Sequence, residues 1–329
     1  MATSLTVVCA NLFSERLAYH QNRCLFNHPL MLSLDPDRLQ PLFQLYLQLG
    51  GGVVLGWVLG RLMPQWIPRF IGQFLFWIGV PISIITFLRG ADLSGKIWIA
   101  PIAAWVAILL GALLAWFWMK GGGGQFAAEK GLTNDNPHEW NKPTQGSFLL
   151  ASMVGNTGYL GFPVNLTLLG ENYFGWALFY DMLGTLLGAY GLGVVLAARF
   201  GRGKKSQGQL VRSLVINPAL WSMGIGLALR QVPLAGWLEE GMTGFAWSAI
   251  ALSLILIGMR LSQLASWRKV RQAGVSLGIK MLLIPLVLGM ALSQVGVIGK
   301  PQLAIVLQMA MPPAFATLAL ADRARSPTL

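Results

Sequence analysis

The chain has 329 residues, of which 55% are hydrophobic and only 11% are charged. Soluble domains carry about 25% charged residues, so this composition excludes an ordinary soluble enzyme and is typical of a polytopic α-helical membrane protein. The net charge of +12 would suit nucleic-acid binding in a soluble protein, but no basic face or motif of that class is present, and nucleic acid is not an expected partner.

The first 37 residues differ from the rest of the chain. We interpret residues 1–37 as a tail that is either disordered or the product of a gene start placed upstream of Met31. Its apolar stretch is short and follows no positive charge, so a secretory signal is not expected. The two cysteines, Cys9 and Cys24, both lie in this tail, and the three histidines lie outside the apolar segments. Neither a disulfide framework, a metal site nor a cofactor is therefore expected.

Apolar segments of helical length follow the tail. They predict nine membrane spans, at residues 41–62, 70–88, 97–119, 145–169, 173–198, 214–229, 237–259, 273–292 and 302–321. A basic loop at residues 200–212 separates a first five-helix unit, 38–199, from a second unit, 213–329, which stops after its fourth helix. Lysines and arginines concentrate in one set of alternate loops, which predicts that these loops are cytoplasmic and that the N-terminus lies outside the plasma (inner) membrane.

Two of these spans carry an interruption near their middle. The span at residues 145–169 contains six polar, glycine or proline residues there, namely Gly155, Asn156, Thr157, Gly158, Gly161 and Pro163, and the span at 302–321 is interrupted at Met311, Pro312 and Pro313. Unpaired backbone amides cost several kcal/mol in lipid, so broken helices persist where they line a site inside the protein. Interrupted spans are typical of transporter binding sites, although kinks repaired by neighbouring helices remain the alternative.

A weak internal repeat relates the two halves. GWVLGRLMP at 56–64 is similar to GLALRQVP at 226–233, and FLRGADL at 87–93 is similar to GMRLSQL at 258–264. The interrupted spans are then the fourth member of each half. Units with five spans must insert in opposite orientations, so the repeat is inverted. The expected fold is an all-α polytopic membrane protein of inverted five-helix repeats, with crossed, proline-broken fourth and ninth helices and no visible tenth span.

Such a crossing favours an anion, because each half-helix N-terminus carries partial positive charge and free N–H donors. Asn156 and Thr157 are candidate hydrogen-bond donors to the substrate. Gln308 either lines the cavity or packs, and Asn217 either caps the helix that begins at Pro218 or lies beside the site. Two ionisable residues lie within spans, Asp181 and Lys280. They are candidates for proton or cation coupling or for an ion pair, although Lys280 could also snorkel to the surface.

Three stretches of the chain resemble the auxin efflux carrier family, the bacterial relatives of plant PIN-type exporters. They are GNTGYLGFPV at 155–164, INPALWSMGIGL at 216–227 and QMAMPPAFATLALA at 308–321. The resemblance implies ten helices in two inverted repeats around a site for small organic anions. By position, it implies that the substrate is surrounded by Asn156, Thr157, Pro163, Gln308, Pro312 and Pro313. It also implies that Asp92 is the acidic residue that plant members keep near the site.

We therefore expect a secondary carrier or facilitator of small organic anions, such as auxin-like compounds or dicarboxylates, which works by alternating access. The alternatives are a bile-acid-symporter-like or cation/proton-antiporter-like carrier, or a truncated membrane protein that does not transport. No catalytic motif is present in the spans, so an enzyme is not expected. Expected partners are the anion, protons or sodium, the lipid bilayer and a second copy of the chain in a homodimer.

Overall fold

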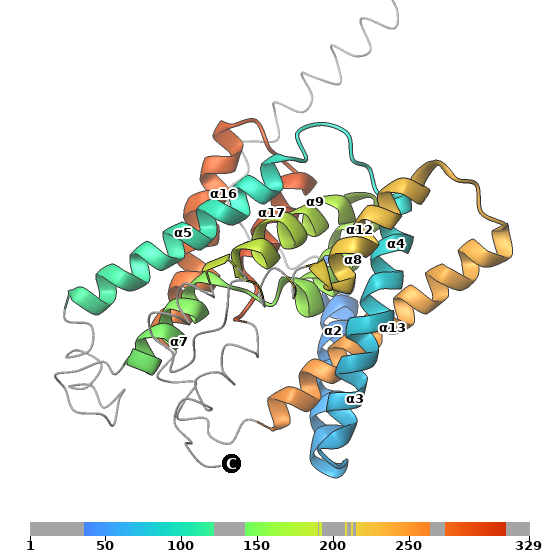
Figure 1. Cartoon of the computed structure of the whole chain (residues 1–329), viewed down its shortest axis with the longest axis horizontal. Coiled ribbons are helices and arrows are strands. Elements are labelled where there is room, and N and C mark those ends of the chain that lie inside the picture. The colour runs from blue at the N-terminus through green and yellow to red at the C-terminus, as the bar shows by residue number, and fades with distance from the viewer. Residues whose placement is uncertain are drawn as a thin grey trace, which may run out of the picture. The chain divides into compact units, whose positions relative to one another are not determined.

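The computed structural model describes residues 36–121, 142–189, 191–192, 208, 212, 215–263 and 274–313. The chain divides into the unit Met1–Gln44 and the unit Leu45–Leu329, and the second unit holds every helix from α3 onward. The described residues of this second unit are mostly helical and contain no strand, only one isolated antiparallel bridge (Figure 1). Residues 1–35 of the predicted tail, most of the basic loop at 200–212 and residues 314–329 lie outside the described residues.

Four helices among the described residues are long and apolar enough to cross a membrane. Two of them are single α-helices, α5 (Ile99–Lys120) and α13 (Gly236–Ser262). The other two are composite. One joins α3 (Trp66–Phe74), η2 (Leu75–Gly79) and α4 (Val80–Gly90), and the other joins α15 (Gly274–Gly278), η7 (Ile279–Leu283) and α16 (Ile284–Gln294). The predicted all-α membrane character is confirmed by these elements.

A proline explains the irregular turn in each composite span. The π-helical turns η2 and η7 come directly before helices that carry a proline in their first two positions, Pro81 in α4 and Pro285 in α16. Proline has no N–H to donate and its ring crowds the preceding turn. The helix widens to π geometry there and continues, so each span stays helical throughout.

The remaining elements are α2 (Pro36–Leu62), which is a long helix, and a series of shorter ones. The shorter elements are α7 (Lys142–Met153), η3 (Thr157–Gly161), α8 (Phe162–Leu169), η4 (Glu171–Tyr173), α9 (Phe174–Phe179), η5 (Tyr180–Leu186), α12 (Pro218–Ala228), η6 (Leu229–Gln231) and α17 (Lys300–Met309). The segment predicted as one span at 145–169 thus contains α7 and the continuous η3–α8 helix, with residues 154–156 outside either helix. The segment predicted at 302–321 is described only as far as residue 313, and its helix α17 ends at Met309.

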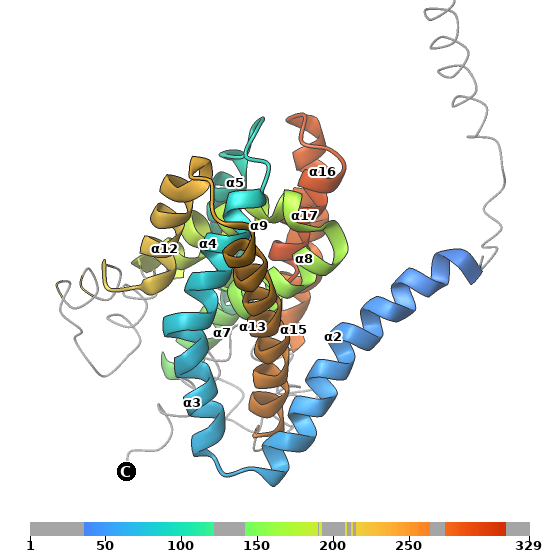
Figure 2. The ribbon, with the colours of Figure 1, turned by 90° about the vertical axis from the view of Figure 1, so that its right-hand side faces the viewer.

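Two groups of helices position the site. In the first group, α4 packs against α12 and α13, and the three lie side by side in Figures 1 and 2. Their buried contacts include Ile84 and Phe87 of α4, Met223 of α12, and Ala246 and Ile250 of α13. This burial of large apolar side chains against one another holds the group together.

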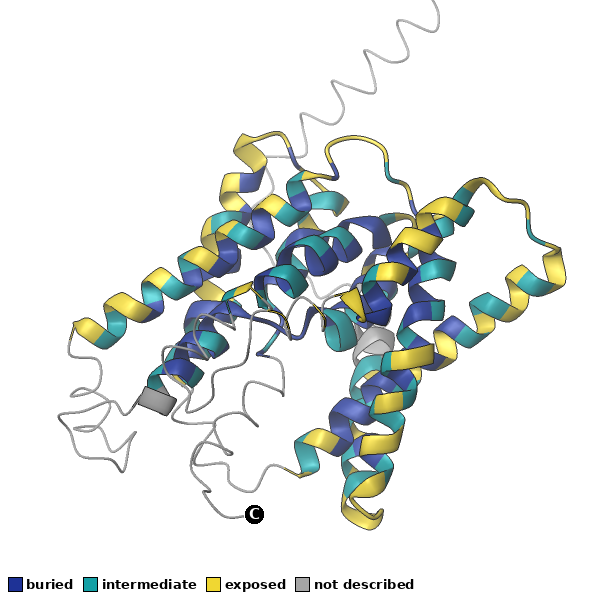
Figure 3. Cartoon of the chain, viewed as in Figure 1, coloured by how far each residue is buried: buried dark blue, intermediate teal, exposed yellow. Residues whose placement is uncertain are grey.

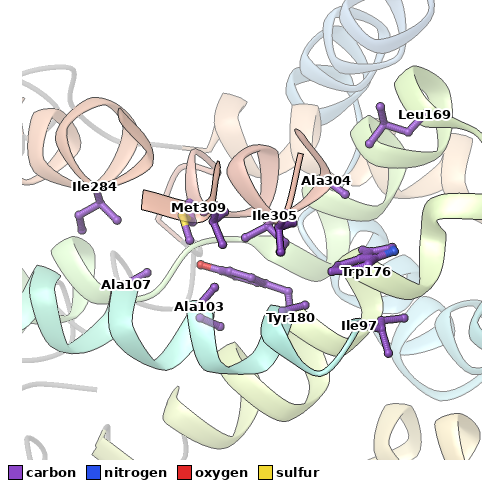
Figure 4. Packing of buried hydrophobic residues seen from close by; sticks show 14 of the residues in the cluster. Ile97, Ala103, Ala107, Leu169, Trp176, Tyr180, Ile284, Ala304, Ile305 and Met309 are labelled. Carbon is purple, nitrogen blue, oxygen red and sulfur yellow. The ribbon is translucent and has the colours of Figure 1, made fainter. Parts of the chain in front are cut away.

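The second group gathers α5, η5, α9, α16 and α17 around Tyr180. Figure 4 shows the Tyr180 ring between Ala103 of α5 and the side chains of Ile305 and Met309 on α17. Small residues on α5 let its neighbours approach closely, as is usual for helices packed in lipid. The buried residues concentrate in the middle of the molecule, where α8 and α9 lie, while the outward faces of α5 and α13 carry many exposed residues (Figure 3).

Glycines bring α2 and α13 into direct backbone contact. A Cβ atom on Gly56 would lie 2.0 Å from the carbonyl oxygen of Ile255, and one on Gly258 would lie 2.0 Å from that of Val53. On α2, Gly52, Gly56 and Gly60 recur every fourth residue and face α13. This small-residue spacing permits close packing between unbroken helices.

Candidate functional site

The ends of α7 and α17 meet through their backbones. The Asn156 N–H donates to the Pro312 carbonyl at 2.7 Å, and Gly155 forms an antiparallel bridge with Pro313. Backbone groups left without helical partners must find acceptors or donors elsewhere when they are buried. Here the two non-helical segments satisfy part of that need in each other.

Gly155 is required at this meeting point by space. A Cβ atom there would lie 2.9 Å from the Met311 carbonyl oxygen and 3.3 Å from Cε of Lys280. Only glycine lets the backbone of residues 154–156 come this close to a second backbone. The contact explains the glycine in sequence position 155 without any appeal to flexibility.

Lys280 reaches this meeting point from η7. Its side chain is 1% exposed, so it does not snorkel to the surface, and its Cε lies beside Gly155. Gly155 follows the end of α7 at Met153, and the adjacent Met311 follows the end of α17. Helix C-termini carry about half a negative charge each. The positive ammonium group therefore lies close to two helix C-termini, which both carry partial negative charge. This accounts for a buried lysine that has no carboxylate partner among the described residues.

Asp181 belongs to η5, and its carboxylate lies against the first turn of η3. The Thr157 hydroxyl donates to Asp181 Oδ1, and both side chains are buried. The second carboxylate oxygen, Oδ2, lies 3.4 Å from the position of a Cβ on Gly158. Within the part of the chain that the structure describes, Asp181 and Lys280 form no ion pair, so the pairing considered from the sequence is not what these two residues do.

Gln308 is fully buried against Gly161. Its Nε2 donates to the Ala177 carbonyl at 3.3 Å, and its Oε1 occupies the space that a Gly161 Cβ would need. Asn165 uses its Nδ2 in the same way, donating to the Gly161 carbonyl at 2.9 Å. Gln308 Oε1 and Asn165 Oδ1 accept no hydrogen bond from any residue that the structure describes. Sequence reasoning missed Asn165; an amide in an apolar helix, four residues after Gly161, was the available signal.

A small pocket opens between α4 and α13 on one side and the segment from η3 to α9 on the other. Ser83 and Phe87 of α4 and Ser253 of α13 line one wall, and Gly158 with Pro163 line the opposite wall. Both Gly158 and Pro163 were candidates from sequence, whereas the serines and the aromatic lining, Tyr159, Phe162, Phe174 and Phe87, were not. Asn156 and Thr157 come directly before Gly158, at the start of the same helix, although they are not among the lining residues.

A bifurcated hydrogen bond joins the two walls of this pocket. The Ser253 hydroxyl lies 3.1 Å from the Tyr159 carbonyl oxygen of η3 and 2.7 Å from the Ile250 carbonyl oxygen of its own helix. One hydroxyl proton can serve only one acceptor fully at a time. Ser253 therefore keeps a hydrogen bond within α13 if η3 moves away.

Two other candidates lie apart from the pocket lining. Asn217 caps α12, because its side chain accepts the Ala219 N–H at 3.0 Å and Pro218 follows it in the first helical position. Asp92 is exposed beyond the end of α4 and accepts the Ser94 N–H at 2.8 Å. The hydrogen bonds from Ser94 lower the pKa of Asp92, and the positive charge of Arg230 lowers it further. Asp92 is thus an ionised surface carboxylate.

These features define an integral membrane protein with a buried polar site at the meeting of two helix ends. The chain belongs to the membrane transport protein family, the family of the auxin efflux carriers, whose model matches residues 138–325. The resemblance found in the sequence is therefore confirmed. This family is a family of membrane transporters and not a class of enzymes. Among the described residues, no group of three histidine, cysteine or acidic side chains could hold a metal ion.

Two archaeal relatives support this assignment. The chain is 28% identical over 212 residues to an uncharacterized transporter of Methanothermobacter thermautotrophicus, a match that covers 64% of each chain. It is also 28% identical over 124 residues to an uncharacterized transporter of Methanocaldococcus jannaschii, covering 36% of this chain and 39% of the relative. The chain thus spans less than two thirds of the length of either relative.

Proposed function

We propose that the protein is a secondary carrier of small organic anions, such as auxin-like compounds or dicarboxylates, in the plasma membrane. The observation that carries the proposal is the pairing of Asn156 with Pro312 and of Gly155 with Pro313, beside a pocket that reaches Gly158. Non-helical backbone at membrane depth is a feature of transporter binding sites, where half-helix ends contact the substrate. In this proposal α7 with η3–α8 and the segment of α17 are the fourth and ninth helices of an inverted repeat.

The local charge supports an anion as the substrate. The η3–α8 helix begins at Thr157 next to the pocket, and a helix N-terminus carries about half a positive charge. Lys280 adds a buried full charge beside Gly155. Asn156 is 8% exposed, and its side-chain amide makes no hydrogen bond with any described residue, so this side chain remains available to a carboxylate. Aromatic pocket walls suit the apolar part of an organic anion.

The position of the pocket supports alternating access. One wall belongs to α4 and α13 and the other to η3, α8 and α9, so motion of these two walls relative to each other would open the pocket to one side and close it to the other. Ser253 is suited to this motion because its hydroxyl has one acceptor on each wall of the pocket, the carbonyls of Tyr159 and Ile250. A homodimer in the membrane remains part of the proposal.

Transport into proteoliposomes tests the proposal directly. Purified full-length protein would be reconstituted, and uptake of a panel of labelled carboxylates, including malate and indole-3-acetate, would be measured with and without imposed pH and sodium gradients. We expect saturable uptake that is lost in Asn156→Ala and retained in Asn172→Ala, a matched control on the exposed turn η4. Equal uptake by wild type and Asn156→Ala would remove Asn156 from the site. Absence of uptake by folded protein across the panel would contradict the carrier.

One observation favours a second candidate, a sodium-coupled carrier like the bile-acid symporters or a cation/proton antiporter. Gln308 Oε1 and Asn165 Oδ1 are buried oxygens that have no donor among the described residues, and both side chains contact Gly161. Hard cations take oxygen ligands of this kind. The sodium gradient separates the candidates: uptake that requires sodium in wild type and loses that requirement in Gln308→Leu would favour sodium coupling.

A further inference from the structure

The Thr157 hydroxyl, a candidate donor to the substrate, already donates its hydrogen bond to the Asp181 carboxylate. We propose that Asp181 competes with the substrate anion for the first turn of η3, so that binding of one anion is accompanied by uptake of one proton. The inference rests on the proposed function, because it describes how the anion site of that carrier is regulated.

Hydrogen-bond accounting gives the first argument. A threonine hydroxyl has one proton to donate, and Thr157 donates it to Asp181 Oδ1. A substrate carboxylate can accept from Thr157 only after Asp181 has given up that bond. The Asp181 carboxylate is also close to Gly158, which lines the pocket. The internal carboxylate and an anion in the pocket therefore approach the same turn of the η3–α8 helix.

Charge gives the second argument. Two carboxylates that share one site cannot both stay ionised at low cost, since like charges at close range raise the energy of the doubly charged state. When the anion arrives, Asp181 takes a proton from solvent and becomes a neutral carboxylic acid, while the substrate keeps its negative charge. For a monoanion such as indole-3-acetate, the charge near Thr157 is then the same before and after binding. The protonated Asp181 also gains an O–H that can donate to the substrate.

Among the described residues, the elements packed on η5 bring no positive side chain into an ion pair with Asp181, and Lys280 of η7 lies beside Gly155. The elements packed on η5 are α5, α9, η3 and α17. Their titratable groups are Tyr159 on η3 and, at the distant ends of α17 and α5, Lys300 and Lys120; η5 itself adds Tyr180, and α9 has none. Tyrosines are uncharged near neutral pH. No lysine, arginine or histidine that the structure describes forms an ion pair with Asp181, so a proton is the available counter-charge.

The test measures protons and anions together. Full-length protein in lipid nanodiscs would be titrated with malate and with indole-3-acetate by calorimetry between pH 5 and 8, in buffers of different ionisation enthalpy. We expect wild type to take up about one proton per anion, with affinity falling about tenfold per pH unit where Asp181 is ionised. Asp181→Asn should bind without proton uptake and more tightly than wild type at pH 8. Glu240→Gln, an exposed carboxylate on α13, should keep the wild-type pH dependence.

The outcomes distinguish failure of the competition by Asp181 from failure of the proposed anion carrier. Anion binding with the same proton uptake in Asp181→Asn as in wild type would overturn the competition and leave the anion carrier standing. No binding of either anion, by folded wild type and folded Asp181→Asn alike, would overturn the anion carrier and the competition with it. Thr157→Val supplies an independent check if Asp181→Asn does not fold: unchanged affinity in this variant would show that the shared hydroxyl is not what the two carboxylates compete for.

Discussion

Glycines produce two close backbone approaches in this molecule, and they differ in what they join. Between α2 and α13, Gly56 and Gly258 bring together two helices that stay continuous. At Gly155, the close approach joins two segments that have left their helices. In the first case each helix satisfies its own backbone hydrogen bonds. In the second, the hydrogen bonds run between segments distant in sequence, so the contact depends on both.

The two close approaches also differ in the polar side chains that surround them. Beside α2 and α13, Ser262 bonds the carbonyl of Met259 in its own helix. Along residues 155–161, by contrast, Lys280, Asp181 and Gln308 are all buried. Buried polar groups are expensive unless they are paired. A close approach between continuous helices therefore serves packing, whereas one between interrupted segments collects groups that can exchange partners.

The largest effect is expected from closing the α2–α13 contact. Gly56→Leu places side-chain atoms against the Ile255 backbone, which cannot move aside, and overpacking of this kind costs about 1–3 kcal/mol or more. We expect loss of the folded monodisperse species in size-exclusion chromatography and a lower unfolding temperature in detergent. Gly50→Ala on the same helix is the control, because nothing lies within 4 Å of its added Cβ. Equal stability of the two variants would contradict the backbone contact.

A substitution at Gly155, where the two interrupted segments meet, is expected to cost less stability but to abolish transport. Gly155→Ala brings a Cβ to 2.9 Å from the Met311 carbonyl oxygen, which should disturb the pairing of Asn156 with Pro312. We expect destabilisation of about 1–3 kcal/mol and no carboxylate uptake in proteoliposomes. Gly224→Ala on α12, where the added Cβ meets nothing within 4 Å, should transport normally. Normal uptake by Gly155→Ala would separate the pairing from function.

Lys280→Met tests the buried charge. Removing the ammonium relieves its desolvation but leaves two helix C-termini without a counter-charge, and these effects oppose each other. We expect little change in the unfolding temperature. Anion affinity should fall about tenfold, since a unit charge contributes about 1–2 kcal/mol over about 10 Å at an effective dielectric constant near 20. Isothermal titration against Lys120→Met, altered at the end of α5, measures the difference. Unchanged affinity would assign Lys280 to stability alone.

Ser253→Ala should have a modest effect. It removes the hydrogen bond to the Tyr159 carbonyl but no other contact across the pocket that depends on the hydroxyl, and one such bond contributes about 0.5–1.5 kcal/mol. We expect uptake to change by less than about tenfold with an unaltered substrate preference. Abolished uptake would instead indicate direct contact between the Ser253 hydroxyl and substrate.

The smallest effect is expected at Asp92. Its pKa is lowered by the hydrogen bonds from Ser94, so any stabilisation it supplies is present above the ordinary aspartate pKa and is lost only as pH falls through the lowered value. Asp92 is therefore ionised throughout the range from pH 5 to 8, and Asp92→Asn should leave the pH dependence of the unfolding temperature and of uptake unchanged in that range. A shifted pH profile in uptake assays would return Asp92 to the candidate coupling groups.

Membrane character and family could be read from the sequence because both depend on local properties. Long apolar segments predict spanning helices wherever they fold, and the motif at 155–164 contains glycine, asparagine and proline at a spacing that few other segments share. The inverted repeat and the orientation in the membrane stay predictions. Asn165 was missed although an amide in an apolar helix, four residues after Gly161, was a usable signal. The serines of the pocket could not be singled out, because nothing in their neighbourhood in the chain separates them from ordinary helical packing residues.

By itself, the sequence determined that the chain is helical, belongs in a membrane and carries polar residues at 155–158. Only the tertiary structure decided what those residues contact. Thr157 donates to Asp181, and Lys280 reaches Gly155 from η7. Residues far apart in the chain are brought together by packing of η5 and η7 against the other helices. Helical periodicity specifies which residues share a face of one helix, but it does not specify which helices become neighbours.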